Sequence, residues 1–148
     1  MNGKAHRFAG VISGGGAAFF ASRGQTNLEV IVESMAGIAA GALGAKFPDW
    51  AEPATSSWHR GPVHSVGTGI WSLGIGIAGI MELQSFCDQR IANLRYCRAL
   101  AQTPEAIQWY TLEIFFWLAV VASLKGLLAG YLSHLALDAT TPRSVPLF

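Results

Sequence analysis

The sequence predicts an all-α integral membrane protein, a helical bundle in one domain that covers residues 1–148. Hydrophobic residues make up 51% of the chain and charged residues only 13%, whereas a soluble domain carries about 25% charged residues. The mean hydropathy is +0.37, and the apolar residues gather in four stretches. A net charge of +1 argues against a nucleic-acid-binding face. We therefore expect the lipid bilayer, and no nucleic acid, as the partner of this chain.

The four apolar stretches predict about four transmembrane helices, because a helix needs about 20 mostly apolar residues to span the hydrocarbon core. In chain order they cover residues 7–22, 28–47, 64–83 and 111–137. The first is short for a span, so it could be tilted or re-entrant, and we interpret it as a retained helix instead of a cleaved signal peptide. Lys125 interrupts the last stretch. A lysine in lipid is costly unless it snorkels, meets water or pairs with a carboxylate, for which Glu33 is a candidate.

The connections between these stretches are polar. Residues 23–27 form a tight turn, and residues 48–62 form a longer loop in which three prolines limit helix formation. The connector of residues 85–105 carries arginines at helical intervals, namely Arg90, Arg95 and Arg98. This connector is an amphipathic helix on the membrane surface, a helical extension or a solvated linker.

Small residues recur four positions apart, as in Gly10 with Gly14 and Gly37 with Gly41. Such pairs let helix backbones approach closely, which supplies much of the packing between helices in lipid. We expect this packing within one chain. The alternative is a homo-oligomer that forms through the Gly-rich helices.

Counting the membrane crossings places every histidine on one side. With four spans, the N-terminus, the loop of residues 48–62 and the C-terminus share one face of the membrane. The imidazole and carboxylate groups on this face belong to His6, Asp49, His59, His64, His134 and Asp138. Lysines and arginines are nearly balanced between the faces, so the positive-inside rule does not decide the orientation. The clustered arginines of the connector favour a histidine side that faces outward.

Two short segments hold pairs of these side chains. In SHLALD, His134 and Asp138 lie one turn apart on one helix face. They can bind one ion together or form a simple hydrogen-bonded pair. In HRGPVH, a Gly-Pro pair bends the chain so that His59 and His64 can turn toward one point.

Imidazole and carboxylate groups together are the ligands that zinc requires. Four histidines and two aspartates exceed the needs of one tetrahedral ion, so we predict one or two zinc ions, with manganese as the alternative metal. Paired metals suit phosphodiester cleavage, because both the attacking and the leaving oxygen need charge stabilisation. Arg60 could hold a phosphate oxygen, or it could form a salt bridge with Asp49 or Glu52. Either of these carboxylates could transfer protons.

Four blocks of the sequence follow one another in a specific order: KAHRFAG, FPDWAEP, HRGPVHS and GYLSHLALDATTP. They resemble the patterns K-x-H, L-P-D-x-D-x-P, H-R-G-x-T-H-S and H-x-x-x-D-x-x-T of the membrane-bound metal-dependent hydrolases of bacteria. That inner-membrane family is distantly similar to zinc-dependent phospholipase C and related zinc nucleases. The resemblance extends from Lys4 to Phe148.

By position, the resemblance implies metal ligands or their close neighbours at His6, Asp49, His59, His64, His134 and Asp138. It also implies that Thr141, which follows the final aspartate, caps or positions the site. One departure bears on activity, because Ala51 stands where the family has its second loop aspartate. Either the adjacent Glu52 replaces that aspartate in a shifted loop, or one metal position is weakened. Pro62-Val63 stands where a glycine-flanked threonine is common in the family, which is a milder departure.

The function that these observations predict is metal-dependent hydrolysis of a phosphoester, such as a phospholipid headgroup, at one face of a bacterial inner membrane. Asp49, Glu52 and Arg60 are the predicted catalytic residues. One alternative is a membrane protein that binds a metal without catalysis. Another is a small transporter or channel for a metal or a proton, which Lys125, Glu33 and Glu113 within apolar runs suggest.

Overall fold

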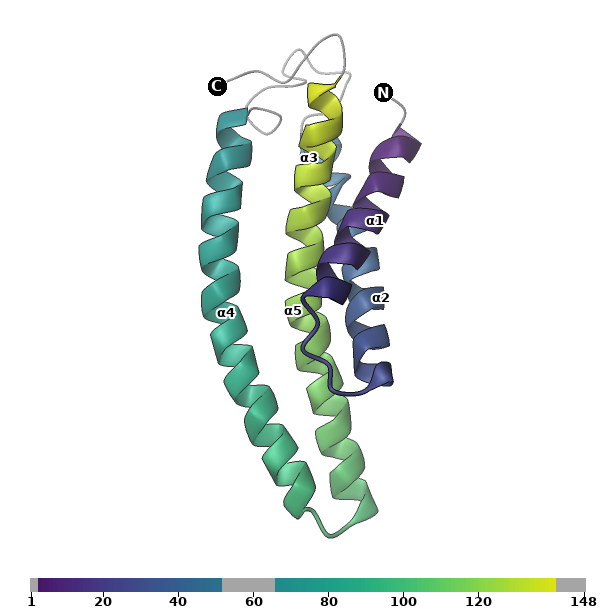
Figure 1. The fold of residues 1–148 in the computed structure, drawn as a ribbon, viewed down its shortest axis with the longest axis vertical. Helices are drawn as coiled ribbons and strands as arrows, with labels where there is room; N and C mark the ends of the chain where they lie inside the picture. The colour runs from purple at the N-terminus through teal and green to yellow at the C-terminus, as the bar shows by residue number, and fades with distance from the viewer. Residues whose placement is uncertain (1–2, 52–65, 141–148) are drawn as a thin grey trace.

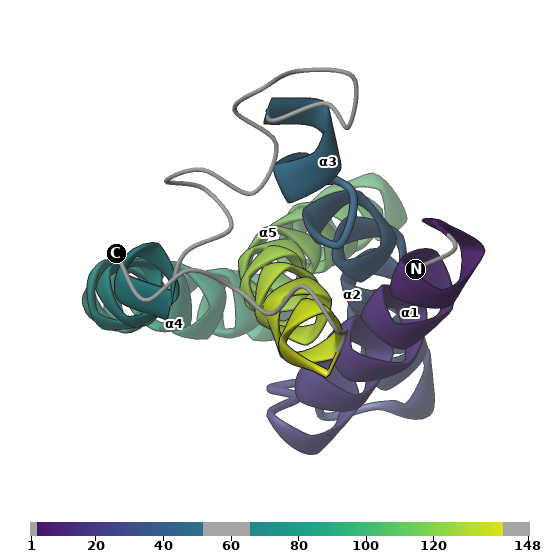
Figure 2. The ribbon, with the colours of Figure 1, turned by 90° about the horizontal axis from the view of Figure 1, so that it is seen from above.

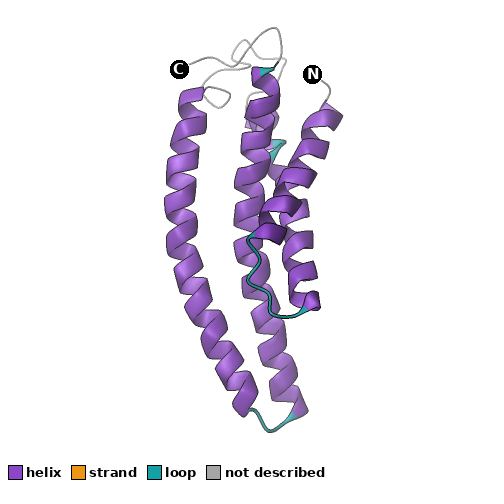
Figure 3. Cartoon of the chain, in the orientation of Figure 1, coloured by secondary structure: helices purple, strands orange, loops and turns teal. Residues whose placement is uncertain are grey.

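The computed structural model describes residues 3–51 and 66–140, and these residues form helices joined by short turns (Figure 3). The helices are α1 (Gly3–Phe20), α2 (Asn27–Gly44), α3 (Phe47–Ala51), α4 (Val66–Leu100) and α5 (Pro104–Ala139). No strand occurs within the described ranges. The predicted all-α class is confirmed.

Helices α1, α2 and α5 pack against one another, and α4 packs along α5 (Figures 1 and 2). Glycines allow the close approach within the first group. A Cβ atom on Gly41 of α2 would lie 2.2 Å from the carbonyl oxygen of Gly10 in α1, and one on Gly130 of α5 would lie 2.1 Å from the carbonyl oxygen of Gly41. Any side chain at these positions would push the helices apart, so the predicted small-residue packing is present within one chain.

The hairpin of α4 and α5 extends well beyond the turn between α1 and α2 (Figure 1). Helix α5 has 36 residues, which is about 54 Å at the α-helical rise, and α1 and α2 have 18 residues each, or about 27 Å. The extension has its own apolar core, in which Ile91 and Leu94 of α4 pack with Ile114 and Leu118 of α5. From this extension α5 runs back along the bundle, and its C-terminal end lies beside the start of α1 (Figure 1).

Two segments within the described residues are long and apolar enough to cross a membrane, Asn27–Ala51 and Pro104–Ala139. They contain the predicted stretches of residues 28–47 and 111–137. Four crossing helices remain a prediction, because length and hydropathy identify only these two. The helix expected over residues 7–22 begins earlier, at Gly3, and the one expected over residues 64–83 begins at Val66 and continues to Leu100.

The connector of residues 85–105 is a helical extension, because α4 continues through it to Leu100 and α5 begins at Pro104. The side chain of Thr103 accepts a hydrogen bond from the backbone N–H of Ala106 and caps α5. Proline suits the first helical position, where its missing N–H has no intrahelical partner. Helix α5 therefore begins directly after α4, and the chain reverses its direction between Leu100 and Pro104 (Figure 1).

The loop expected over residues 48–62 is wrong in its first part, because Phe47–Ala51 forms the short helix α3. Pro48 lies in the first turn of α3, where proline is tolerated since no N–H is needed there. Asp49 therefore sits on a helix instead of in a turn. Residues 52–65 lie outside the described residues.

Candidate metal centre

Three helices bring four of the predicted ligands together at one end of the bundle. His6 comes from the first turn of α1, Asp49 from α3, and His134 and Asp138 from the last turns of α5. These helix ends lie at the same end of the molecule (Figure 1). His6, His134 and Asp138 are buried, whereas the Asp49 side chain is 46% exposed. The group is thus closed on the protein side and open at Asp49.

The donor atoms of this group face one another at short range. Asp138 lies between the two histidines, with Oδ1 3.5 Å from Nε2 of His6 and Oδ2 3.3 Å from Nε2 of His134. Asp49 Oδ1 lies 3.7 Å from the same Nε2 of His134. His6, His134 and Asp138 each offer one ligand atom within 4.8 Å of the others, so this trio could hold a metal ion.

His134 is oriented by the backbone. Its Nδ1 lies 2.7 Å from the carbonyl oxygen of Ala45, just after the end of α2. Because a carbonyl oxygen only accepts hydrogen bonds, Nδ1 is the donor of this pair, and in the neutral form of the ring Nε2 would present its lone pair to the carboxylates. Lone pairs on nitrogen and oxygen repel one another, so a proton or a metal cation is needed between them. A backbone carbonyl behind the ring is also the usual support of a histidine that binds a metal.

His6 stacks on His134, with ring centroids 4.0 Å apart and an angle of 26° between the planes. Burial lowers the pKa of His6 below its ordinary value of 6.5, and the neighbouring His134 lowers it further. His6 lies in the first turn of α1, outside the two candidate spans. A lowered pKa favours the neutral imidazole, which is the form that binds metal.

These separations fit a zinc ion. Donors about 2.1 Å from one ion in a tetrahedron lie about 3.4 Å from each other, and the measured donor separations are 3.3, 3.5 and 3.7 Å. The same separations are long for direct hydrogen bonds, which have their mode near 2.9–3.0 Å (about 0.5 Å less). Two imidazoles and two carboxylates also match the ligand types of zinc.

The structure describes four of the six residues predicted as metal ligands, and all four lie together. The remaining predicted site residues lie outside the described residues: Glu52, His59, Arg60, His64 and Thr141. Two features of the site were missed from the sequence. One is the carbonyl of Ala45, since every residue has a carbonyl and none stands out. The other is a set of basic residues, Lys4, Arg7 and Lys46, which line one pocket together with Asp49. The lysine of the KAHRFAG block, Lys4, was the signal in the sequence that could have indicated this set.

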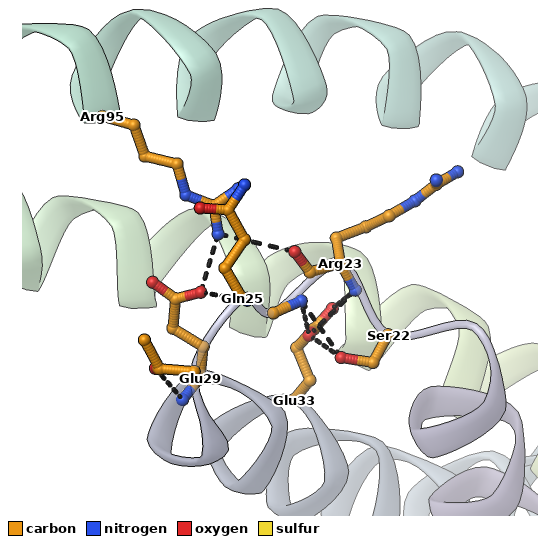
Figure 4. A network of polar contacts seen from close by, with 8 residues as sticks. Ser22, Arg23, Gln25, Glu29, Glu33 and Arg95 are labelled. Atoms are coloured by element: carbon orange, nitrogen blue, oxygen red, sulfur yellow. Dashed lines mark hydrogen bonds and ion pairs between the residues drawn. The ribbon is translucent and has the colours of Figure 1, made fainter.

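A second polar cluster lies at the turn between α1 and α2 (Figure 4). The buried carboxylate of Glu33 accepts hydrogen bonds from the Ser22 hydroxyl and from the backbone N–H groups of Arg23 and Gly24. The buried Glu29 carboxylate accepts from the Gln25 N–H at 2.6 Å and from Arg95 of α4 at 2.7 Å. The two glutamates therefore fix the turn and tie it to the α4–α5 hairpin.

The charged side chains that suggested transport have structural partners. The ammonium group of Lys125 donates to the carbonyl oxygen of Ala21 at 3.0 Å, so the expected direct pair with Glu33 is wrong. Glu33 is instead held by the turn, whose N–H groups point at its carboxylate. Glu113 pairs with Arg90. Each charge thus stabilises a connection between helices.

The whole chain, residues 1–148, matches the family model described as YdjM inner membrane protein, and it therefore belongs to this family. The two long apolar helical segments fit an inner-membrane location. No curated protein and no solved structure matches the chain. The family description agrees with the membrane part of the resemblance drawn from the sequence and does not extend to hydrolysis.

Proposed function

We propose that this protein is a membrane-bound hydrolase that uses a divalent metal ion, zinc or manganese, to cleave a phosphoester. The observation that carries the proposal is the convergence of His6, His134 and Asp138, from opposite ends of the chain, at zinc-like donor separations. Burying three ionisable groups at one point costs free energy unless they are paired or bind a metal. A phospholipid headgroup is the phosphoester within reach of a site at a membrane face.

The described residues divide the work as follows. His6, His134 and Asp138 would hold the ion, and the Ala45 carbonyl keeps His134 in the tautomer that binds it. A zinc ion supplies a Lewis acid and lowers the pKa of bound water toward neutrality. Asp49 is the only group of the four with an exposed side chain. It can therefore accept a proton at the open side of the site or complete the ligand set.

Hydrolysis of a chromogenic phosphodiester by protein purified in mild detergent tests this function. Asp138→Asn should reduce metal-dependent turnover more than about 100-fold, since even the outer partners of metal ligands are worth about 10–100-fold. Glu105→Gln removes a carboxylate at the opposite end of the same helix and serves as the matched control. Turnover should stop on treatment with a chelator and return with zinc or manganese.

Two outcomes would contradict the proposal. Turnover that survives Asp138→Asn would mean that the cluster does not carry the chemistry. Metal binding without turnover of any phosphodiester or phospholipid would favour the non-catalytic alternative. Far-ultraviolet circular dichroism and thermal unfolding of each variant separate loss of the site from loss of the fold.

A further inference from the structure

Two hollows adjoin the candidate metal centre and share two lining residues, Lys46 and Trp50. One is a polar pocket of about 510 Å³ whose lining also includes Lys4, Arg7 and Asp49. The other is an apolar groove of about 490 Å³ lined by Leu43, Phe47, Leu127 and Tyr131 in addition to the shared pair. Both volumes lie within the range of small-molecule binding sites. Because Lys46 and Trp50 line both, the two hollows lie next to each other.

The polar pocket is suited to an anion. Lys4, Arg7 and Lys46 line it, and Asp49 is the one carboxylate in its lining among the described residues. Arg7 and Lys46 form no ion pair within the described part of the chain. Asp49 is also one of the four clustered residues of the metal centre. An anion in this pocket would therefore lie beside the candidate metal centre.

The apolar groove is suited to a hydrocarbon chain. It runs over the surface of α2, α3 and α5, and most of its lining side chains are exposed, including Leu43 at 65% and Trp50 at 78%, whereas Tyr131 is buried. In an inner membrane protein such a surface faces lipid, and tryptophan is typical of the boundary between hydrocarbon and headgroups. Lys46 can lay its aliphatic stem along the groove and direct its ammonium group into the polar pocket.

We propose that the two hollows form one binding site for an anionic phospholipid. The phosphate and the charged headgroup lie among Lys4, Arg7 and Lys46, and one acyl chain lies in the groove against Phe47 and Trp50. This inference rests on the proposed function, because it names the substrate class of the same centre. The lipid enters sideways from the bilayer, and its phosphoester comes to rest beside Asp49 and the metal ligands.

The charge favours an anionic over a zwitterionic lipid. Three cations surround the pocket, whereas a phosphatidylcholine headgroup carries its own cation beside its phosphate and would be repelled by a further one. The groove favours a lipid over a soluble phosphate. Inorganic phosphate would fill the polar pocket and make no use of the adjacent apolar groove.

Native mass spectrometry of the metal-free full-length protein tests this site, with phosphatidylglycerol and phosphatidylcholine of identical chains as probes. Wild-type protein should bind phosphatidylglycerol more tightly than phosphatidylcholine. Lys46→Gln or Arg7→Gln should each weaken phosphatidylglycerol binding about fivefold, the worth of one basic residue near anionic lipid. Arg98→Gln, at the far end of α4, is the matched control and should leave binding unchanged.

A second pair of measurements addresses the groove and the source of the phosphate. Leu43→Trp fills the exposed groove and should weaken both lipids, while millimolar inorganic phosphate should not displace phosphatidylglycerol. Equal binding of the two lipids, unchanged by Lys46→Gln, would mean ordinary boundary lipid and would overturn the inference. Displacement by inorganic phosphate would overturn it in favour of a soluble anion. Since the metal is removed, lipid binding can succeed even where hydrolysis fails.

Discussion

Glu33 is completely buried at the turn between α1 and α2, with 1% of its surface exposed. Its carboxylate is tolerated in this buried position because it accepts hydrogen bonds from a hydroxyl and two backbone N–H groups of the turn. Hydrogen bonds to an ionised acceptor are about twice as strong as those between neutral groups. Glu33 thus replaces the water or anion that this ring of donors would otherwise need.

Glu33→Gln should lower the free energy of unfolding by about 1–3 kcal/mol. The NH2 group of the new amide would face the hydroxyl and N–H donors of the turn in a buried position. Thermal unfolding in detergent measures this. Glu113→Gln is the matched control, since its partner Arg90 is half-exposed and surface ion pairs are worth about 0–1 kcal/mol. Equal effects of the two substitutions would show that the turn does not depend on Glu33.

The clustering of the histidines and aspartates followed from the sequence. Counting crossings placed His6, Asp49, His134 and Asp138 on one face, and the structure brings these four together. The partners of the buried charges could not be predicted in the same way. Lys125 bonds to a carbonyl and Glu33 to backbone N–H groups, and backbone groups leave no mark in an amino-acid sequence.

Helix α2 is the element on which the packing depends, because its glycines face two helices. The carbonyl oxygen of Gly37 would lie 2.4 Å from a Cβ atom on Gly14 of α1 and 2.5 Å from one on Gly126 of α5. The sequence showed the spacing of Gly10, Gly14, Gly37 and Gly41. It did not show that one helix would use the same small residues on two sides, since spacing alone does not identify the neighbours.

Gly41→Ala should destabilise the protein by about 1–3 kcal/mol, the usual cost of overpacking a close contact. The added methyl group would meet the carbonyl of Gly10 at 2.2 Å, and backbone cannot move aside cheaply. Gly16→Ala is the matched control, because nothing lies within 4 Å of its Cβ position, and alanine favours helix by up to about 1 kcal/mol.

Thermal unfolding with both variants side by side gives the measurement. A Gly41→Ala protein as stable as Gly16→Ala would contradict the packing of α1, α2 and α5 described above.

The connector of residues 85–105 is a second element whose neighbours could not be identified from spacing alone. Its helical arginine spacing was visible in the sequence, but whether it lay on the membrane or continued α4 depended on the apolar seam with α5.

The whole molecule has two different ends. The metal-ligand cluster and the cationic pocket lie where α1 begins and α5 ends, and the far end is the α4–α5 extension (Figure 1). Arg90, Arg95 and Arg98 lie on that extension. Basic residues also lie at the cluster end, so the positive-inside rule does not decide the orientation. The clustering of these three arginines favours an extension in the cytoplasm and a metal-ligand cluster on the outer face.

Cysteine labelling tests this orientation without changing the extension. Cys97 is exposed on the extension and Cys87 is buried. A membrane-impermeant maleimide should therefore label Cys97 in inside-out vesicles and not in intact cells. Lys4→Cys in a Cys97→Ser background should show the opposite pattern. Labelling of both positions from the same side would contradict a molecule that crosses the membrane between its two ends.

Metal content measured by mass spectrometry of the purified protein tests the central claim most directly. Protein dialysed against zinc should retain at least one ion per chain, because His6, His134 and Asp138 offer three donor atoms within 4.8 Å of one another and Asp49 lies beside His134. His134→Ala should bring the content close to zero, and Glu105→Gln should leave it unchanged. Retention of the same amount of zinc by His134→Ala, folded as the wild type, would contradict a metal centre built on these residues.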